Sequence, residues 1–277
     1  MTERCLSYPQ VSARCSRVVL LIAAALVAAA PLQAAAAPLT TYAVGSFPVV
    51  PGLVDVEFPI HRDFRGQVGV VAMGQGTYDD GNPFAYLSLV SPSAWLHFDG
   101  VRNLRLSVAF QEFFHREVAP MGLRDAHEER LVARARIQQP RGAAAVYELI
   151  QLDVRSFDDP GGTHRVVYRP RFRLGQGFNL DAVRIHSLVL FQEVAFRFSD
   201  ASYTTRAFDF FRAFAGYTWT TKRGTFVTLG LVGQISLNRP ATRYNFLYGP
   251  VLSLAYRFRS APAAAEAPPA PSDVEVQ

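Results

Sequence analysis

The chain has 277 residues, of which 49% are hydrophobic and 18% are charged, and its formal net charge is +5 at pH 7. This length fits one large β-domain or two ordinary domains. A net charge this small gives no reason to expect a nucleic acid as partner, because domains that bind nucleic acids carry clustered basic surfaces.

Residues 1–37 have the order of segments found in a secretory signal peptide. Arg14 and Arg17 precede an apolar run at 18–30, and a proline and a stretch of alanines follow it. The run is shorter than the about 20 apolar residues that a membrane-spanning helix needs. The sequence therefore predicts export with cleavage of residues 1–37, and residues 38–65 are expected to form a periplasmic N-terminal segment.

Between residues 66 and 258, apolar and polar residues alternate with period two along about ten segments, as in strands with one apolar and one polar face. Leu104 and Leu106, for example, alternate with Arg105 and Ser107. The segments lie at about 66–78, 84–98, 104–111, 130–138, 150–155, 163–174, 187–198, 206–219, 225–237 and 245–258. Clusters of Gly, Pro, Asn and Asp separate them, as expected of hairpin connections.

The segment 163–174 shows where the two faces must lie. Arg169, Arg171 and Arg173 share one face, and Phe172 belongs to the other. Burying unpaired guanidinium groups in a soluble core would be very unfavourable. A barrel lumen allows them to be hydrated, or paired with Glu148, Asp153 or Glu193, while the apolar face contacts lipid. On this interpretation the lumen is lined by charged residues, namely Arg134, Arg136, Asp153, Arg155, Arg169, Arg171, Arg173, Glu193 and Arg197.

The sequence thus predicts an all-β protein, a transmembrane antiparallel up-and-down β-barrel at 66–258. The period-two segments predict about ten strands (range 8–12). Ten is an even number, as expected of single-chain bacterial barrels. Most segments exceed the usual strand length of globular proteins and approach the about 9–11 residues that a tilted strand needs to cross a bilayer. The expected location is the outer membrane of a Gram-negative bacterium, with outer-membrane lipid and the barrel assembly machinery as partners. The oligomeric state is left open.

The last strand-like segment ends in Tyr256 and Phe258. A final strand that alternates up to a terminal aromatic residue resembles the signal by which outer-membrane barrels are recognised for assembly. Residues 259–277 are rich in Ala and Pro and lack periodicity, which predicts a disordered tail.

From about residue 95 to residue 258 the order of features resembles the domain of unknown function 2490 family, whose uncharacterised bacterial members are regarded as outer-membrane β-barrels. The matching stretches are "EERLVARARIQ", "YELIQLDVRSF", "HRVVYRPRFRL", "LVLFQEVAFRF", "DFFRAFAGYTW" and "LYGPVLSLAYRF". The resemblance implies a fold and a location, and it carries over no active-site residue.

The sequence favours a structural or undetermined role, or a narrow channel with an arginine-rich lumen, over an enzyme. One alternative is an outer-membrane acyl hydrolase using His186, Ser187 and Glu193. Adjacent strand residues point to opposite faces, however, so His186 and Ser187 are not expected to share a proton. The other alternative is a soluble exported β-sandwich that binds a ligand, with its apolar face turned inward.

No metal site and no cofactor are expected. Cys5 and Cys15 both precede the expected cleavage site, and the histidines lack paired metal-binding spacing. Asp79, Asp80 and Asn82 could offer oxygen ligands to calcium. Turns favour the same residues for backbone reasons, and we therefore interpret this stretch as a turn.

Overall fold

The computed structural model describes residues 43–121, 123, 125–158, 164–182, 185–199, 208–237 and 243–258, all within one compact unit, Tyr42–Gln277. The predicted signal peptide and the predicted tail lie outside the described residues. Among those residues, no helix has the length and hydropathy needed to cross a membrane.

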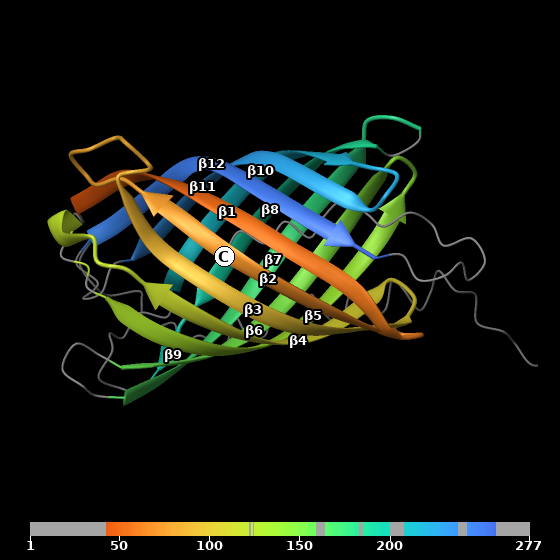
Figure 1. Ribbon diagram of the computed structural model, residues 1–277, viewed down its shortest axis with the longest axis horizontal. Helices are drawn as coiled ribbons and strands as arrows, with labels where there is room; N and C mark the ends of the chain where they lie inside the picture. The colour runs from red at the N-terminus through yellow and green to blue at the C-terminus, as the bar shows by residue number, and fades with distance from the viewer. Residues whose placement is uncertain are drawn as a thin grey trace, which may run out of the picture. The chain divides into compact units, whose positions relative to one another are not determined.

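The described part of the chain is almost entirely strand and forms a closed β-barrel, which confirms the predicted fold class (Figure 1). The strands are β1 Ala43–His61, β2 Phe64–Gln75, β3 Tyr86–Val101, β4 Leu104–His115, β5 Ala126–Arg141, β6 Ala144–Asp158, β7 His164–Asn179, β8 His186–Phe196, β9 Phe198–Ser199, β10 Phe208–Thr220, β11 Thr225–Leu237 and β12 Arg243–Arg257. A three-residue 3-10 helix, η2, spans Ala119–Met121 between β4 and β5.

Eleven long strands close the barrel, within the predicted range, and the two-residue β9 continues β8 and pairs with β7. Each long strand is antiparallel to the next long strand along the chain. The first and last strands, β1 and β12, close the barrel as a parallel pair. An odd number of strands in an up-and-down barrel requires this parallel pair. The expectation of an even number is therefore wrong.

The eleventh strand is β1, in a region that the sequence analysis placed outside the barrel. The barrel begins at Ala43 rather than at residue 66, because β1 pairs with β2 on one side and with β12 on the other. Pro48 and Pro51 obscured this strand, since proline within a run argues against a central strand. Cα pairing with β12 is interrupted between Pro48 and Gly52, at the prolines, and resumes beyond them. Opposite this gap, the backbone of Gly249 lies so close to β1 that a β-carbon would not fit there.

The two ends of the barrel differ in their connections. One end, the long-connection end, carries the connections 76–85 and 116–125; the other, the short-turn end, carries the turns 62–63, 102–103 and 142–143. Because the strand number is odd, β1 starts at the long-connection end and β12 finishes at the short-turn end (Figure 1).

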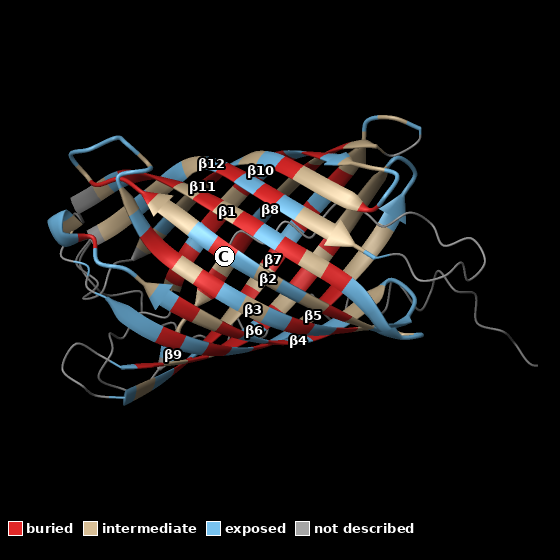
Figure 2. Ribbon diagram, viewed as in Figure 1, coloured by how far each residue is buried: buried red, intermediate tan, exposed pale blue. Residues whose placement is uncertain are grey.

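Burial alternates along the strands, as Figure 2 shows by bands of colour. In β4, Leu106 and Val108 are exposed on the outside, while Ser107 and Gln111 are buried inside. The face predicted to be apolar is thus the outer face, and the face predicted to be charged lines the lumen.

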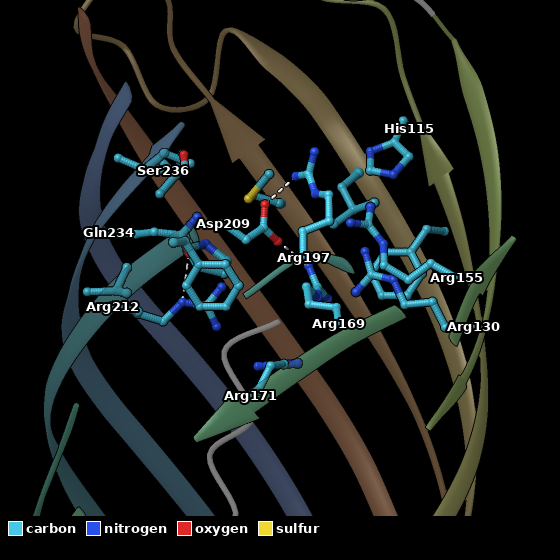
Figure 3. A pocket seen from close by; sticks show the side chains of 18 residues that line it. His115, Arg130, Arg155, Arg169, Arg171, Arg197, Asp209, Arg212, Gln234 and Ser236 are labelled. Carbon is cyan, nitrogen blue, oxygen red and sulfur yellow. Dashed lines mark hydrogen bonds and ion pairs between the residues drawn. The ribbon is translucent and has the colours of Figure 1, made fainter. Parts of the chain in front are cut away.

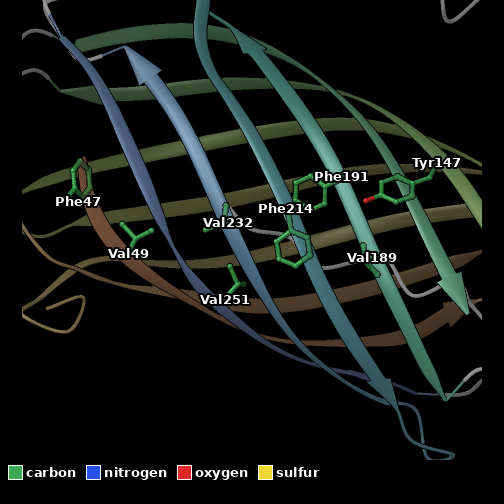
Figure 4. Close-up of a cluster of buried hydrophobic side chains, with 8 residues drawn as sticks. All are labelled: Phe47, Val49, Tyr147, Val189, Phe191, Phe214, Val232 and Val251. Carbon is green, nitrogen blue, oxygen red and sulfur yellow. The ribbon is translucent and has the colours of Figure 1, made fainter. Parts of the chain in front are cut away.

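Part of the lumen is apolar. A cluster of buried side chains crosses the barrel interior from β1 and β10–β12 to β6 and β8 (Figure 4). Its members are Phe47, Val49, Tyr147, Val189, Phe191, Phe214, Val232 and Val251. Gly175 on β7 leaves room for the ring of Tyr147, because a β-carbon there would collide with that ring. The barrel therefore has an internal core of side chains.

Candidate functional site

Another part of the lumen wall, on β5–β8 and β10, holds a network of buried carboxylates and guanidinium groups. Asp153 is 0% exposed. Its Oδ2 lies 2.6 Å from Nη2 of Arg169 and 3.6 Å from Nη1 of Arg171. Strand register brings these groups together, since Asp153 is paired with Arg169 and the next inward residue of β7 is Arg171.

Glu193, 1% exposed, is the second centre of the network. Its two oxygens lie 2.7 Å from Nη2 of Arg171 and 2.7 Å from Nη2 of Arg173, and Arg212 lies 3.9 Å away. The register of β8 explains the set, because Glu193 is paired with Arg173 on β7 and with Arg212 on β10.

Two more carboxylates complete the network nearer the long-connection end. Glu128 accepts two hydrogen bonds from Arg155, at 2.5 and 2.7 Å, and a third from Arg130. Asp209 pairs with Arg197 and lies 3.5 Å from Nη1 of Arg169.

Arginines outnumber carboxylates in these ion pairs. Seven arginines are paired with the four carboxylates Glu128, Asp153, Glu193 and Asp209. The arginines are Arg130, Arg155, Arg169, Arg171, Arg173, Arg197 and Arg212. Several guanidinium groups also lie over aromatic rings, such as that of Arg130 at 3.4 Å from the ring centre of Phe113. Such contacts stabilise a cation without neutralising it.

A cavity of about 290 Å³ lies beside the network, in the half of the lumen nearer the long-connection end (Figure 3). Six of the seven arginines line it, and Asp209 is the one carboxylate among its lining residues. His115, Gln234 and Ser236 add polar groups. Other lining residues are apolar and come mainly from β1–β4, β11 and β12, namely Val49, Pro51, Met73, Leu89, Phe113, Phe210, Val232 and Leu247. The cavity is therefore cationic on one wall and apolar on the other.

A separate charged cluster lies toward the short-turn end. Glu57 of β1 pairs with Arg65 and lies 3.2 Å from Nη1 of Arg105 and 3.0 Å from Nη2 of Arg257. Arg105 also pairs with Asp99 at 2.7 Å. This cluster joins β1 to β2, β4 and β12, and none of its members lines the cavity.

The structure places all nine predicted lumen residues on the inner face, but it does not bring all of them together. Arg134 lies 4.1 Å from the ring centre of Trp95 and donates from Nε to Gln151, which in turn donates to Asp153. Arg136 likewise lies over Tyr147. Glu148, which the sequence analysis offered as a partner of the arginines, belongs to the outward parity of β6, so that expectation is wrong.

Four members of the network were not among the predicted residues. Glu128, Arg130 and Arg212 follow the same alternation as the predicted ones and could have been found by extending it. Asp209 could not, because a register irregularity between Phe208 and Phe210 breaks the alternation there and leaves both 209 and 210 buried.

The residues considered for hydrolysis are not assembled into a catalytic group. His186 lies outside and contacts the hydroxyl of Tyr217, whereas Ser187 is buried inside and donates to the carbonyl oxygen of Thr218. The carboxylate of Glu193 is held by arginines.

The acidic stretch considered for calcium has the hydrogen bonds of a turn. The side chain of Asp80 accepts from the backbone N–H of Asn82, and that of Asn82 accepts from Phe84. Among the described residues, no group of three or more His, Cys, Asp or Glu side chains is arranged to hold a metal ion. The side-chain oxygens of Asp80 and Asn82 thus accept hydrogen bonds from the backbone of the turn.

Comparison with known proteins adds no assignment, because no family model and no curated protein matches this chain. The resemblance to the domain of unknown function 2490 family stays a prediction. The barrel and its lumen are therefore the features from which a function can be inferred.

Proposed function

We propose that this chain is an outer-membrane β-barrel of a Gram-negative bacterium, exported by a cleaved signal peptide. In this proposal its lumen is filled by side chains, and its role is structural or ligand-binding rather than that of an open channel. The assembly machinery would read Tyr256 and Phe258, which lie at the end of β12 with their rings in edge-to-face contact at 4.8 Å.

The observation that carries the proposal is the inverted distribution of polarity across the wall. Outward-facing large hydrophobic residues such as Leu131, Leu229 and Leu231 are exposed, while Asp153, Arg171 and Glu193 are buried. A soluble protein rarely exposes a continuous apolar surface larger than a few hundred Å². Lipid is the solvent in which such an outer face is stable, and a closed barrel leaves no backbone edge unpaired there.

Aromatic residues on the outer face support the same proposal. One group lies near the long-connection end and includes Phe114, Tyr168, Phe211 and Phe246; another lies near the short-turn end and includes Phe58, Phe64, Trp219 and Phe258. Along β12, Phe246 and Phe258 are separated by about 40 Å of strand, or about 28 Å along the axis at a tilt of about 45°. That height is close to the apolar band of about 25 Å between the aromatic girdles of known barrels.

Filling of the lumen argues against an open channel. Phe113, Gln151, Asp153 and Ala195 are inward-facing residues of three different strands, and each is at most 1% exposed. Barrels of about eight strands are filled by side chains, and open channels belong to barrels of about 16–18 strands. Eleven strands lie nearer the filled class.

Both alternative functions lose support from the structure. A sandwich would need two facing sheets, whereas the described strands form one closed barrel. The hydrolase would need His186 and Ser187 on one face, whereas the wall of the barrel separates them.

Membrane fractionation with gel mobility tests the proposal. We expect the protein in the outer-membrane fraction, with different mobility before and after boiling, because a folded barrel stays compact in detergent until it is heated. Recovery in the soluble fraction with equal mobility in both samples would contradict the proposal.

A further inference from the structure

We propose that the cavity of the lumen binds a phosphate monoester whose uncharged part is apolar, with the phosphate against the arginine wall and the apolar part against the opposite wall. This site is additional to the proposed location in the outer membrane. It depends on the interior of the barrel, so the two proposals can fail separately.

The lining of the cavity is strongly cationic. Each carboxylate of the network contacts two or three guanidinium groups, and six arginines line the cavity beside one carboxylate, Asp209. Guanidinium groups in a buried site stabilise an anion through charge-assisted hydrogen bonds. A phosphate monoester carries about −1.5 to −2 at pH 7 and three acceptor oxygens, so it can contact more of these guanidinium groups than a single carboxylate can.

The guanidinium donors of this wall are gathered at the cavity. Arg130 pairs with Glu128, and Arg197 pairs with Asp209. Both arginines line the cavity together with Arg155 and Arg169 (Figure 3). Guanidinium forks bind phosphate through paired N–H groups, which makes this wall suited to an oxyanion.

The rest of the cavity has a shape and polarity suited to an apolar group. Its opposite wall is formed by aliphatic side chains such as Val49, Leu89 and Leu247, which offer no donor to an inorganic ion. Its volume of about 290 Å³ far exceeds the space of one water molecule and is near the lower limit of small-molecule sites. A phosphate alone would leave the apolar wall unused, whereas a short alkyl or aryl phosphate contacts both walls.

Calorimetric titration of the barrel folded in non-ionic detergent micelles tests the proposal, with n-hexyl phosphate, inorganic phosphate and n-hexanol as probes. Empty micelles give the background from partitioning. We expect saturable binding of hexyl phosphate, weaker binding of inorganic phosphate and no saturable binding of hexanol.

The test variant is the double substitution Arg130→Gln with Arg197→Gln. It leaves Glu128 paired with Arg155 and leaves Asp209 beside Arg169. The matched control is Arg105→Gln, which removes an interior arginine of the cluster at the short-turn end. We expect the double variant to bind hexyl phosphate about tenfold or more weakly, because hydrogen bonds to charged groups are lost, and the control to bind it as the unchanged protein does.

Heat-modifiable mobility of each variant confirms that the barrel is folded before titration. Equal weakening in the double variant and in the Arg105→Gln control, or no saturable binding by the unchanged protein, would overturn the site. Equal affinity for inorganic phosphate and hexyl phosphate would overturn the role of the apolar wall. A folded barrel that fails to bind leaves the proposed location in the membrane standing.

Discussion

Replacing Glu193 with glutamine is expected to lower the free energy of unfolding by about 3–5 kcal/mol, because removing one partner of a buried charge set leaves the others uncompensated. Here the change removes a carboxylate that pairs with Arg171, Arg173 and Arg212. Urea-induced unfolding, followed by tryptophan fluorescence in lipid vesicles or detergent micelles, measures the effect.

Two variants serve as controls for this prediction. Glu148→Gln makes the same chemical change on the outer face, and we expect no loss of stability, because a neutral side chain is no costlier than a carboxylate on a lipid-facing wall. Arg173→Gln removes a cation but leaves Glu193 with two others, so its effect should be well below that of Glu193→Gln. Equal stability of Glu193→Gln and Glu148→Gln would contradict the described network.

Replacing Leu131 with arginine is expected to impair folding into lipid vesicles by about 2–4 kcal/mol, the depth-dependent penalty for a cation on the lipid face. Leu131 is 60% exposed and lies on the outer face of β5, away from either strand end. In a soluble protein an exposed leucine is replaced by arginine at little energetic change. The yield of heat-modifiable protein after folding into vesicles measures the effect.

Phe84→Arg is the matched control. Phe84 is 74% exposed, but it lies in the connection between β2 and β3 beyond the strand ends. We expect Phe84→Arg to fold into vesicles nearly as well as the unchanged protein. Equal yields for Leu131→Arg and Phe84→Arg would count against a lipid-facing wall.

Most of the fold could be predicted from the sequence, because a barrel wall imposes period two on every strand and the two faces meet different solvents. β5, β7 and β10 kept this period without interruption over their central residues. β1 could not be recognised in the same way, since Pro48, Pro51 and Pro59 weaken the local strand signal. Its place in the barrel depends on pairing with β12, which is distant in sequence.

The candidate site was only partly predictable. Alternation indicates that Arg169, Arg171 and Arg173 point inward, but it does not indicate which carboxylates they reach. That choice depends on the registers between β6, β7, β8 and β10, and these are properties of the closed barrel. The cavity depends further on the curvature that brings β11 and β12 opposite the arginines, for which no local sequence signal exists.

The two tryptophans provide the most direct test of the lipid-facing wall. Trp95 is 5% exposed and lies in the lumen near Arg134, whereas Trp219 is 46% exposed on the outer face of β10. The variants Trp95→Phe and Trp219→Phe each leave one reporter, and both can be folded into vesicles of phospholipid with brominated acyl chains. The account predicts strong quenching of Trp219 fluorescence and little quenching of Trp95 fluorescence. Unquenched Trp219, or stronger quenching of Trp95 than of Trp219, would contradict it.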